Sequence, residues 1–230
     1  VAGAPVTKIK VFSGTDLKLT APLLEYDIST IDQETGETFI DGLDPATDYQ
    51  VAIYSGETLR GWADYTTLVP DIDPLAAGVI DIRDNTDPAA VANAVAGAPD
   101  GAIILVKRGS FYDLPEDDLD KSITIRAAYG FGEQKARLYT TGNWNIANGV
   151  TIDHIRFIDL ELRGEDFGGD YIFNPQRDAV YIGEILFENC EIGTVRGIMR
   201  IRNTIEIDYF KIINSVVDSI GSYGIFTADT

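Results

Sequence analysis

The chain has 230 residues, 45% of them hydrophobic and 10% aromatic, which fits folded domains with a sizeable core and excludes a disordered chain. Its net charge of −19 and isoelectric point of about 4.2 argue against nonspecific binding to nucleic acid or to anionic lipid, since both need Lys and Arg clusters. The single cysteine excludes an internal disulfide framework, and no stretch is long and apolar enough to span a membrane. We therefore expect a secreted or cell-surface protein, one that could contain calcium.

Residues 1–69 have the pattern of an all-β domain. An alternating stretch from Val6 to Phe12 predicts a strand, and residues 38–40 predict a second, short one. Residues 43–53, Leu-Asp-Pro-Ala-Thr-Asp-Tyr-Gln-Val-Ala-Ile, resemble the entry to the sixth strand of fibronectin type III domains, which implies that Tyr49 forms a tyrosine corner. Such a domain needs roughly 100 residues. Because the opening strands have no counterpart here, we expect a sandwich that is incomplete at its N-terminus.

Residues 70–77 contain two prolines and predict a linker to a second domain, residues 78–230. A short strand at 79–82 precedes a helix whose apolar face comes from alanines and valines between Ala90 and Val95. Thr86 or Asp87 is expected to cap this helix and Gly97 to end it. A continuous apolar strand follows at 102–106, and another is expected from residue 123.

This order of strand, Ala-rich helix, buried strand and glycine resembles the start of right-handed parallel β-helix proteins of the pectate-lyase-like superfamily. The stretch Gly-Ala-Ile-Ile-Leu-Val-Lys-Arg-Gly-Ser-Phe-Tyr at residues 101–112 carries the resemblance. It implies a helix that caps the first coil of a β-helix. The combination with a partial fibronectin-like domain also resembles uncharacterised surface proteins of Bacteroidetes, often encoded near polysaccharide-degrading enzymes.

One pattern recurs three times, in copies that begin at Val150, Val180 and Ile205. Apolar residues occupy the first, third, sixth and eighth positions of each copy, and Asp or Asn occupies the tenth. Steps of two, three and two exclude a helix and predict two short strands joined by a bend. A repeat of this kind is typical of a β-solenoid. The alternative is an antiparallel sandwich in which the similarity of the copies is accidental.

The tenth positions, Asp159, Asn189 and Asn214, are predicted to stack at one corner and to pass hydrogen bonds from coil to coil. Cys190, next to that corner, is expected to be buried and inert. The match continues through an apolar residue three positions later and then through a further strand. These positions are Leu162, Ile192 and Val217, followed by 171–174, 197–200 and 224–227.

The further strand supplies the predicted ligand-facing surface. Its outward pairs are Asn174 and Gln176, Arg200 and Arg202, and Thr227 and Asp229. A planar guanidinium matches a carboxylate such as that of a uronic acid. The resemblance to β-helix polysaccharide lyases, in which Arg or Lys takes the sugar C5 proton, makes Arg200 and Arg202 the catalytic candidates. The alternative is that both arginines pair with acids on neighbouring coils, namely Glu191, Glu206 or Asp208.

Two acidic stretches are candidates for a calcium site, because hard cations need several carboxylate oxygens. One is Glu165, Asp166 and Asp170 in a Gly-rich loop, and the other is residues 113–120; both could equally be solvated acidic turns. Trp144 is predicted to be an exposed ring that stacks on sugars. His154 is expected to be an exposed bend residue rather than a catalytic base.

The predicted architecture is therefore all-β: a partial fibronectin type III-like sandwich followed by a right-handed parallel β-helix with an N-terminal capping helix. We expect a secreted or cell-surface protein, lipid-anchored by a segment outside this sequence if at all. It is expected to act on or bind acidic polysaccharide, in the manner of a polysaccharide lyase. The alternatives are a noncatalytic glycan-binding or adhesion module and a structural component of a surface assembly. Because the chain stops at a strand position, further coils or a partner chain are expected after it.

Overall fold

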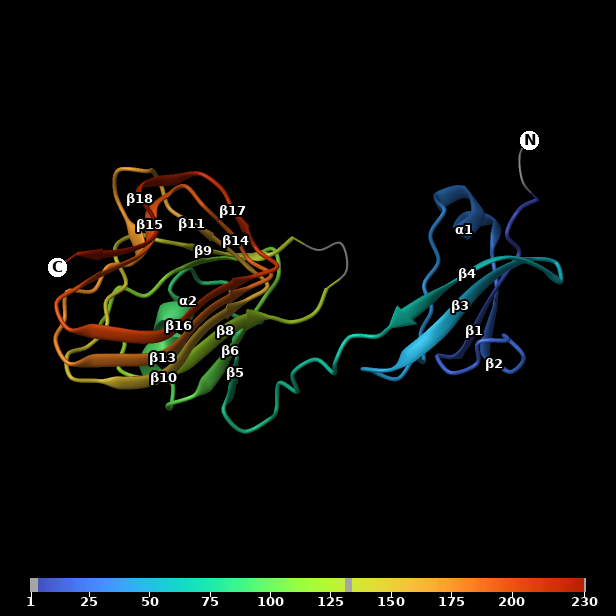
Figure 1. Cartoon of the computed structure of the whole chain (residues 1–230), viewed down its shortest axis with the longest axis horizontal. Helices are drawn as coiled ribbons and strands as arrows, with labels where there is room; N and C mark the ends of the chain where they lie inside the picture. The colour runs from blue at the N-terminus through green and yellow to red at the C-terminus, as the bar shows by residue number, and fades with distance from the viewer. Residues whose placement is uncertain (1–3, 131–133, 230) are drawn as a thin grey trace. The chain divides into compact units, whose positions relative to one another are not determined.

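A computed structural model describes residues 4–130 and 134–229 of the chain. The chain divides into two compact units, Val1–Asp71 and Ile72–Thr230 (Figure 1). Strands account for 49% of the structure and helices for 6%, so the predicted all-β class is confirmed. No helix within the described ranges has the length and hydropathy needed to cross a membrane.

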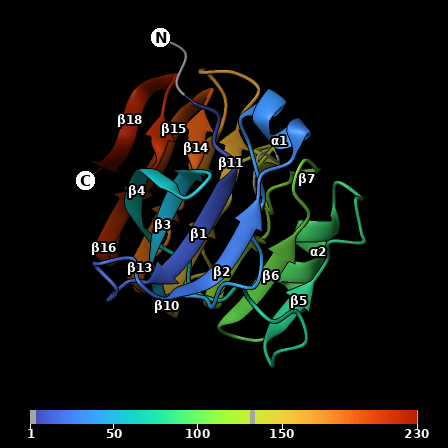
Figure 2. The same cartoon turned by 90° about the vertical axis from the view of Figure 1, so that its right-hand side faces the viewer.

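The N-terminal unit is built on one antiparallel sheet with the strand order β2-β1-β3-β4 (Figure 2). A short helix, α1 (Thr30–Thr35), follows the second strand, because Ser29 and Asp32 form a reciprocal capping box. The strand expected at residues 38–40 is wrong, since these residues lie outside every strand. The four strands are β1 (Lys8–Ser13), β2 (Pro22–Asp27), β3 (Asp48–Ser55) and β4 (Thr58–Thr66).

Tyr49 makes the contact that the sequence predicts for it. Its ring is buried at the start of β3, and its hydroxyl accepts a hydrogen bond of 2.9 Å from the backbone N–H of Asp44. The bond ties the loop before β3 to the strand itself. It satisfies a backbone donor that the turn would otherwise leave free.

The second unit is a parallel β-solenoid of about 6 turns, as the repeat predicts. Each wall is a parallel sheet, with the strand orders β16-β13-β10-β8-β6-β5, β17-β14-β11-β9-β7 and β12-β15-β18. The six-stranded sheet comprises β5 (Val79–Asp81), β6 (Ala102–Val106), β8 (Ile123–Ala127), β10 (Thr151–Ile158), β13 (Val180–Glu188) and β16 (Ile205–Ile213). The five-stranded sheet comprises β7 (Phe111–Asp113), β9 (Ala136–Tyr139), β11 (Leu160–Arg163), β14 (Glu191–Gly193) and β17 (Val216–Val217). The three-stranded sheet comprises β12 (Tyr171–Phe173), β15 (Val195–Arg202) and β18 (Ile220–Asp229).

The strand register confirms the alignment of the three copies. Ile152 pairs with Ile182, and Phe157 with Phe187, across β10 and β13. The same rows continue into β16. One detail of the prediction is wrong: the apolar step of three does not separate two strands. Each copy forms one continuous strand, and the irregular step is absorbed inside it near Gly183, where a Cβ atom would clash with the carbonyl oxygen of Asp153.

The corner between the six-stranded and five-stranded sheets is formed by the tenth positions. Asp159, Asn189 and Asn214 all adopt left-handed backbone conformations, with φ of 59°, 51° and 49°. Asp and Asn tolerate this region better than other L-residues do. The side-chain amide of Asn189 donates to Asp159 Oδ1 at 2.8 Å, which confirms a side-chain hydrogen bond between coils. Asp159 is buried and also pairs with Lys135 (2.6 Å) and Arg108.

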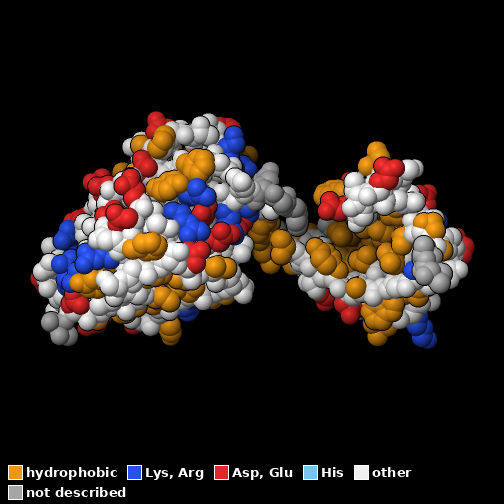
Figure 3. All heavy atoms as spheres, turned by 90° about the horizontal axis from the view of Figure 1, so that it is seen from above, with side chains coloured by type: hydrophobic (Ala, Val, Ile, Leu, Met, Phe, Trp, Pro, Cys, Tyr) orange, Lys and Arg blue, Asp and Glu red, His pale blue; other side chains and the backbone are white. Residues whose placement is uncertain are grey.

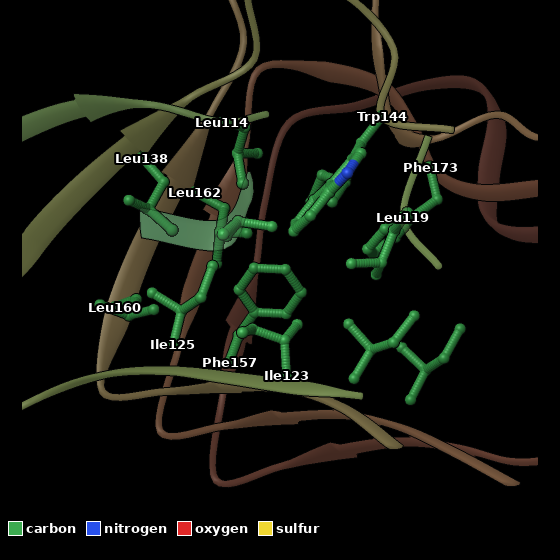
Figure 4. Packing of buried hydrophobic residues seen from close by; sticks show 14 of the residues in the cluster. Leu114, Leu119, Ile123, Ile125, Leu138, Trp144, Phe157, Leu160, Leu162 and Phe173 are labelled. Carbon is green, nitrogen blue, oxygen red and sulfur yellow. The ribbon is translucent and has the colours of Figure 1, made fainter. Parts of the chain in front are cut away.

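The interior is a hydrophobic cluster to which strands of all three sheets contribute. Figure 4 shows the packing of part of this cluster. Helix α2 (Ala90–Gly97) contributes Ala90, Val91 and Val95 to this cluster. The Asp87 carboxylate accepts the backbone N–H of Ala89, as expected of a residue that caps the start of this helix, although the N-cap position itself is Ala89. Cys190 is buried, as expected. Burial raises the pKa of its thiol to about 11.

Candidate functional site

The outer surface of the three-stranded sheet carries the predicted ligand-facing residues. Arg200 pairs in register with Thr227, and Arg202 with Asp229, across β15 and β18. On the coil that precedes β15, Gln176 pairs with Arg202 through an isolated parallel bridge. In the same strands Phe173 and Met199 are buried. The sheet therefore gathers the predicted residues in adjacent coils.

Arg200 is held by a carboxylate on the next coil. Its Nε donates to Asp229 Oδ2 at 2.7 Å, and a second guanidinium nitrogen contacts the same oxygen. The hydrogen bond that Asp229 accepts from Arg200 raises the pKa of Arg200 above its ordinary value. A general base must release its proton near the working pH. The setting of Arg200 therefore opposes the catalytic role predicted from the family resemblance.

Arg202 is held by neutral groups. Its Nη1 donates to Gln176 Oε1 at 2.8 Å, and its Nη2 donates to Asn174 Oδ1 at 3.1 Å. The predicted outward row thus exists as a hydrogen-bonded ladder. The alternative expectation is right in kind for Arg200, which pairs with an acid of the next coil, but that acid is Asp229 and not Glu191, Glu206 or Asp208. Those acids lie on the other two sheets, whereas parallel pairing brings together residues of one sheet.

Arg196 completes the group of cations on β15. Its guanidinium lies 4.7 Å from the ring centroid of Tyr223 and 5.6 Å from that of Tyr171. Arg200 lies over the same Tyr223 ring at 4.5 Å. Within the described ranges, neither Arg196 nor Arg202 forms an ion pair with a carboxylate. The sequence pattern assigns no role to either tyrosine; the Tyr171 ring is buried, while Tyr223 is only half-buried.

The predicted calcium ligands are not assembled into a site. Asp166 Oδ1 accepts the backbone N–H groups of Gly168 and Gly169, both at 2.7 Å, so it closes its own turn. Burial, followed by repulsion from Asp166 and Glu165, raises the pKa of Asp170. Among the residues that the structure describes, no group of three or more His, Cys, Asp or Glu could hold a metal ion.

The second acidic stretch is likewise engaged by neighbouring coils. Glu116 accepts a hydrogen bond of 2.8 Å from the Thr141 hydroxyl. Asp118 forms an ion pair of 2.8 Å with Arg177. These acids therefore hold coils together instead of converging on a cation.

Trp144 is not an exposed ring, so that prediction is wrong. Its side chain is only 1% exposed and stacks on Phe173 with ring centroids 5.2 Å apart (Figure 4). An isolated parallel bridge pairs the two residues, which places Trp144 in the inward row one coil earlier. His154 is half-buried inside β10 rather than exposed at a bend, and burial lowers its pKa.

A groove of about 340 Å³ lies on the outer face of the five-stranded sheet, and sequence reasoning missed it entirely. Figure 3 looks from above onto the side of this unit where β9, β11 and β14 lie, and Lys, Arg, Asp, Glu and hydrophobic side chains are interspersed there. The signal was present in the alternation of Arg137 and Tyr139 around buried Leu138. The groove is lined by Gly109, Phe111, Gln134, Lys135, Arg137, Glu161 and Glu191.

Comparison with known proteins gives a family but no function. No curated protein matches the chain, and no solved structure matches it. Residues 111–230 match the model of a family described as "Domain of unknown function (DUF4957)". The matched region begins at β7 and takes in both outer surfaces described above. Since the match covers more than half of the chain, this protein belongs to the DUF4957 family.

Proposed function

We propose that the β-solenoid unit binds polysaccharide that carries carboxylate groups, and that it does so without cleaving it. The proposed surface is the arginine strip, defined as Arg196, Arg200 and Arg202 with Asn174 and Gln176. One observation carries the proposal. In a chain of net charge −19, one strand presents three arginines, and Asp229 is the one carboxylate paired with them in the described ranges.

The strip is organised before any ligand arrives. Arg202 is fixed by the Asn174 and Gln176 side chains, which leave its charge uncompensated. Arg196 and Arg200 are fixed against the Tyr223 ring. Ordering flexible side chains at a binding surface costs roughly 0.5–1.5 kcal/mol each. Guanidinium groups held in place avoid that cost and offer paired N–H donors to a carboxylate.

Binding is favoured over cleavage by the setting of Arg200, which is paired with Asp229. A lyase needs a group that accepts the C5 proton of the sugar, and the raised pKa of Arg200 disfavours that step. The calcium expected to neutralise a uronate also finds no assembled ligand set in the described ranges. Polysaccharide-lyase activity is therefore the competing outcome of the test below.

The other expectations fit the same picture. We propose that the N-terminal unit is a fibronectin type III-like spacer, which is supported by the hydrogen bond between Asp44 and Tyr49. We also propose that α2 caps the first coil of a pectate-lyase-like β-helix, because its apolar residues join the end of the core. A location outside the cell or on its surface is consistent with a polysaccharide partner. A purely structural role predicts no glycan binding at all.

Isothermal titration calorimetry with oligogalacturonate and oligomannuronate tests the proposal. Wild-type protein should bind at least one of them, and Arg202→Gln should weaken binding about tenfold or more, since a hydrogen bond to a charged group contributes roughly 1.5–3 kcal/mol. Arg60→Gln, an exposed arginine on β4, is the matched control and should bind normally. Raised salt should weaken the wild-type interaction.

Two results would contradict this function. Equal binding of the acidic oligosaccharide by wild type and Arg202→Gln would show that the arginine strip does not bind it. An absorbance increase from unsaturated products, with or without calcium, would show that the protein cleaves the polysaccharide as a lyase.

A further inference from the structure

The groove on the five-stranded sheet is a second surface, separate from the arginine strip. We call it the aromatic groove and define it by Phe111, Lys135, Arg137, Glu161 and Glu191, with Tyr139 beside it. Its volume of about 340 Å³ falls in the range of small-molecule sites, roughly 300–1,000 Å³. The arginine strip belongs to the three-stranded sheet, so the two surfaces share no residue.

The register of the solenoid builds this groove from separate coils. Phe111 pairs with Arg137, Arg137 with Glu161, and Glu161 with Glu191. Adjacent strands lie about 4.8 Å apart, so this outward row extends roughly 14 Å across three inter-strand spacings. Sheet geometry therefore fixes how far apart the side chains of the groove stand.

An exposed aromatic pair forms one end of the row. Phe111 is 52% exposed, and its ring stacks on that of Tyr139 with centroids 6.2 Å apart and planes inclined by 29°. Burying half of a large aromatic ring releases substantial free energy when a ligand covers it. The Arg137 guanidinium lies 5.3 Å from the Phe111 ring centroid and 5.7 Å from that of Tyr139, so the half-exposed pair stands next to a fixed polar donor.

The polar side chains beside this pair are rigid. Arg137 Nε donates to Glu161 Oε2 at 2.7 Å, and its Nη1 donates to the Tyr139 hydroxyl at 3.1 Å. Glu161 also accepts from Arg163 Nε at 2.8 Å. Burial alone would raise the pKa of Glu161, but these two hydrogen bonds outweigh it and lower the value. Glu161 therefore remains an ionised acceptor next to fixed donors at neutral pH.

The charges that line the groove cancel, which distinguishes it from the arginine strip. Lys135 and Arg137 are cationic, while Glu161 and Glu191 are anionic. Lys135 is further committed to the corner, since its Nζ donates to Asp159 Oδ1 and to the Asn189 carbonyl oxygen, both at 2.6 Å. A polyanion would meet as much repulsion as attraction here, whereas hydroxyl groups can both donate and accept.

We infer that the aromatic groove binds an uncharged pyranose unit of a polysaccharide, with the sugar ring on the Phe111–Tyr139 pair and its hydroxyls on Arg137 and Glu161. This site goes beyond the acidic-polysaccharide proposal and rests on different residues. A chain with alternating neutral and acidic sugars, or two different chains, could then be held on two walls of one solenoid. The concave and polar lining fits a sugar better than a flat protein interface does.

Neutral hexasaccharides of β-1,4-glucan, β-1,4-xylan, β-1,3-glucan and β-1,4-mannan are the probes, and binding is followed by saturation-transfer NMR and calorimetry. Wild type should bind at least one of them. Phe111→Ala should weaken that binding about tenfold or more, and Glu161→Gln should weaken it less, because a hydroxyl can still donate to the amide oxygen. Phe167→Ala is the matched control: its ring is 49% exposed but does not line the groove, so binding should not change.

Each variant is assayed against both ligand classes, which keeps the two proposals distinct. Phe111→Ala should lose the neutral probe and keep the acidic one, and Arg202→Gln should do the reverse. The emission of the buried Trp144 verifies that each variant is folded. Failure of every neutral probe to bind wild type at millimolar concentration overturns the inference, as does neutral binding that is unchanged in Phe111→Ala. Neither result bears on the arginine strip.

Discussion

The two units of this chain bury hydrophobic residues to very different extents. In the solenoid, one cluster of buried side chains extends from α2 to the last coils. In the described part of the N-terminal unit, the buried hydrophobic residues are Val11, Phe12, Tyr49 and Ala52. Phe39 remains 79% exposed, and a hollow of about 430 Å³ in this unit is lined by apolar residues such as Ile9 and Ile53 together with polar residues such as Asp32. Figure 3 shows hydrophobic side chains exposed on this unit. Stacked coils bury an inward row between two neighbours each, whereas a single sheet covers little of its own apolar face.

The largest effect on this difference between the two units is expected from opening a cavity in the core of the solenoid. Phe157 is fully buried and stacks on Phe187 with centroids 5.1 Å apart. We expect Phe157→Ala to lower the free energy of unfolding of this unit by about 3–5 kcal/mol through lost transfer energy and the cavity. The N-terminal unit should keep its stability, because it contains none of the side chains around that cavity.

Urea unfolding can follow both units in one sample, since the chain has two tryptophans and each unit contains one. Trp144 is buried, while Trp62 is 53% exposed, so their emission differs in the native state. Trp62→Phe provides a control that isolates the solenoid signal. A shift of both unfolding transitions in Phe157→Ala would show that the two units unfold cooperatively. It would contradict the view that each unit is stabilised by its own core.

An intermediate effect is expected at the corner. Asn189→Leu removes the hydrogen bond to Asp159 and places a branched side chain at φ 51°, so we expect a loss of about 1–3 kcal/mol. Asn189→Gly is the control, because glycine adopts this φ freely but also lacks the hydrogen bond. The difference in the free energy of unfolding between the two variants gives the contribution of backbone strain, because both lack the hydrogen bond to Asp159.

Thiol labelling of Cys190 measures this effect in the folded protein. The thiol is buried and its pKa is about 11, so it should react only when the coil opens. Asn189→Leu should therefore label faster than Asn189→Gly, and both faster than wild type. Equal rates in all three would exclude a stabilising role for the corner.

The smallest effect is expected in acid. Hydrogen bonds from Arg137 and Arg163 lower the pKa of Glu161 despite its burial. Its contribution to stability is therefore complete above the unfolded-state value of about 4.3 and is lost as the pH falls through the lower folded value. Partial exposure of its partners limits the contribution to below about 1 kcal/mol. Glu161→Gln should make the stability of the solenoid depend less on pH in acid. Urea unfolding between pH 3 and 7 measures this, and the unfolding transition of the N-terminal unit, followed by Trp62, should keep its pH dependence.

Sequence predicted the solenoid better than the N-terminal unit for a physical reason. In parallel coils, aligned residues are also neighbours, so matching Ile152 with Ile182 is equivalent to predicting a contact. The N-terminal unit has no such repeat. Its helix α1 has six residues and depends on Ser29 and Asp32, too short a segment for a periodic signal.

The candidate sites divide in the same way. The outward row of Asn174, Gln176 and Arg202 was predictable because the strands that carry it are repeated copies. The aromatic groove was not, because Phe111 and Arg137 come from earlier coils in which the repeat pattern is not visible in the sequence. Trp144 was misplaced for the same reason, since no aligned copy indicated its inward position.

The corner of Asp159, Asn189 and Asn214 also makes the coils exchangeable. Val180 of one copy pairs with Ile205 of the next, and the corner residues repeat with them, so we expect that an added coil of the same spacing would keep the inward rows continuous. Outward side chains beyond the added coil would then be displaced by one inter-strand spacing of about 4.8 Å. Variation at outward positions opens no cavity in the core, so a change of surface chemistry is expected to cost less stability than a change in an inward row.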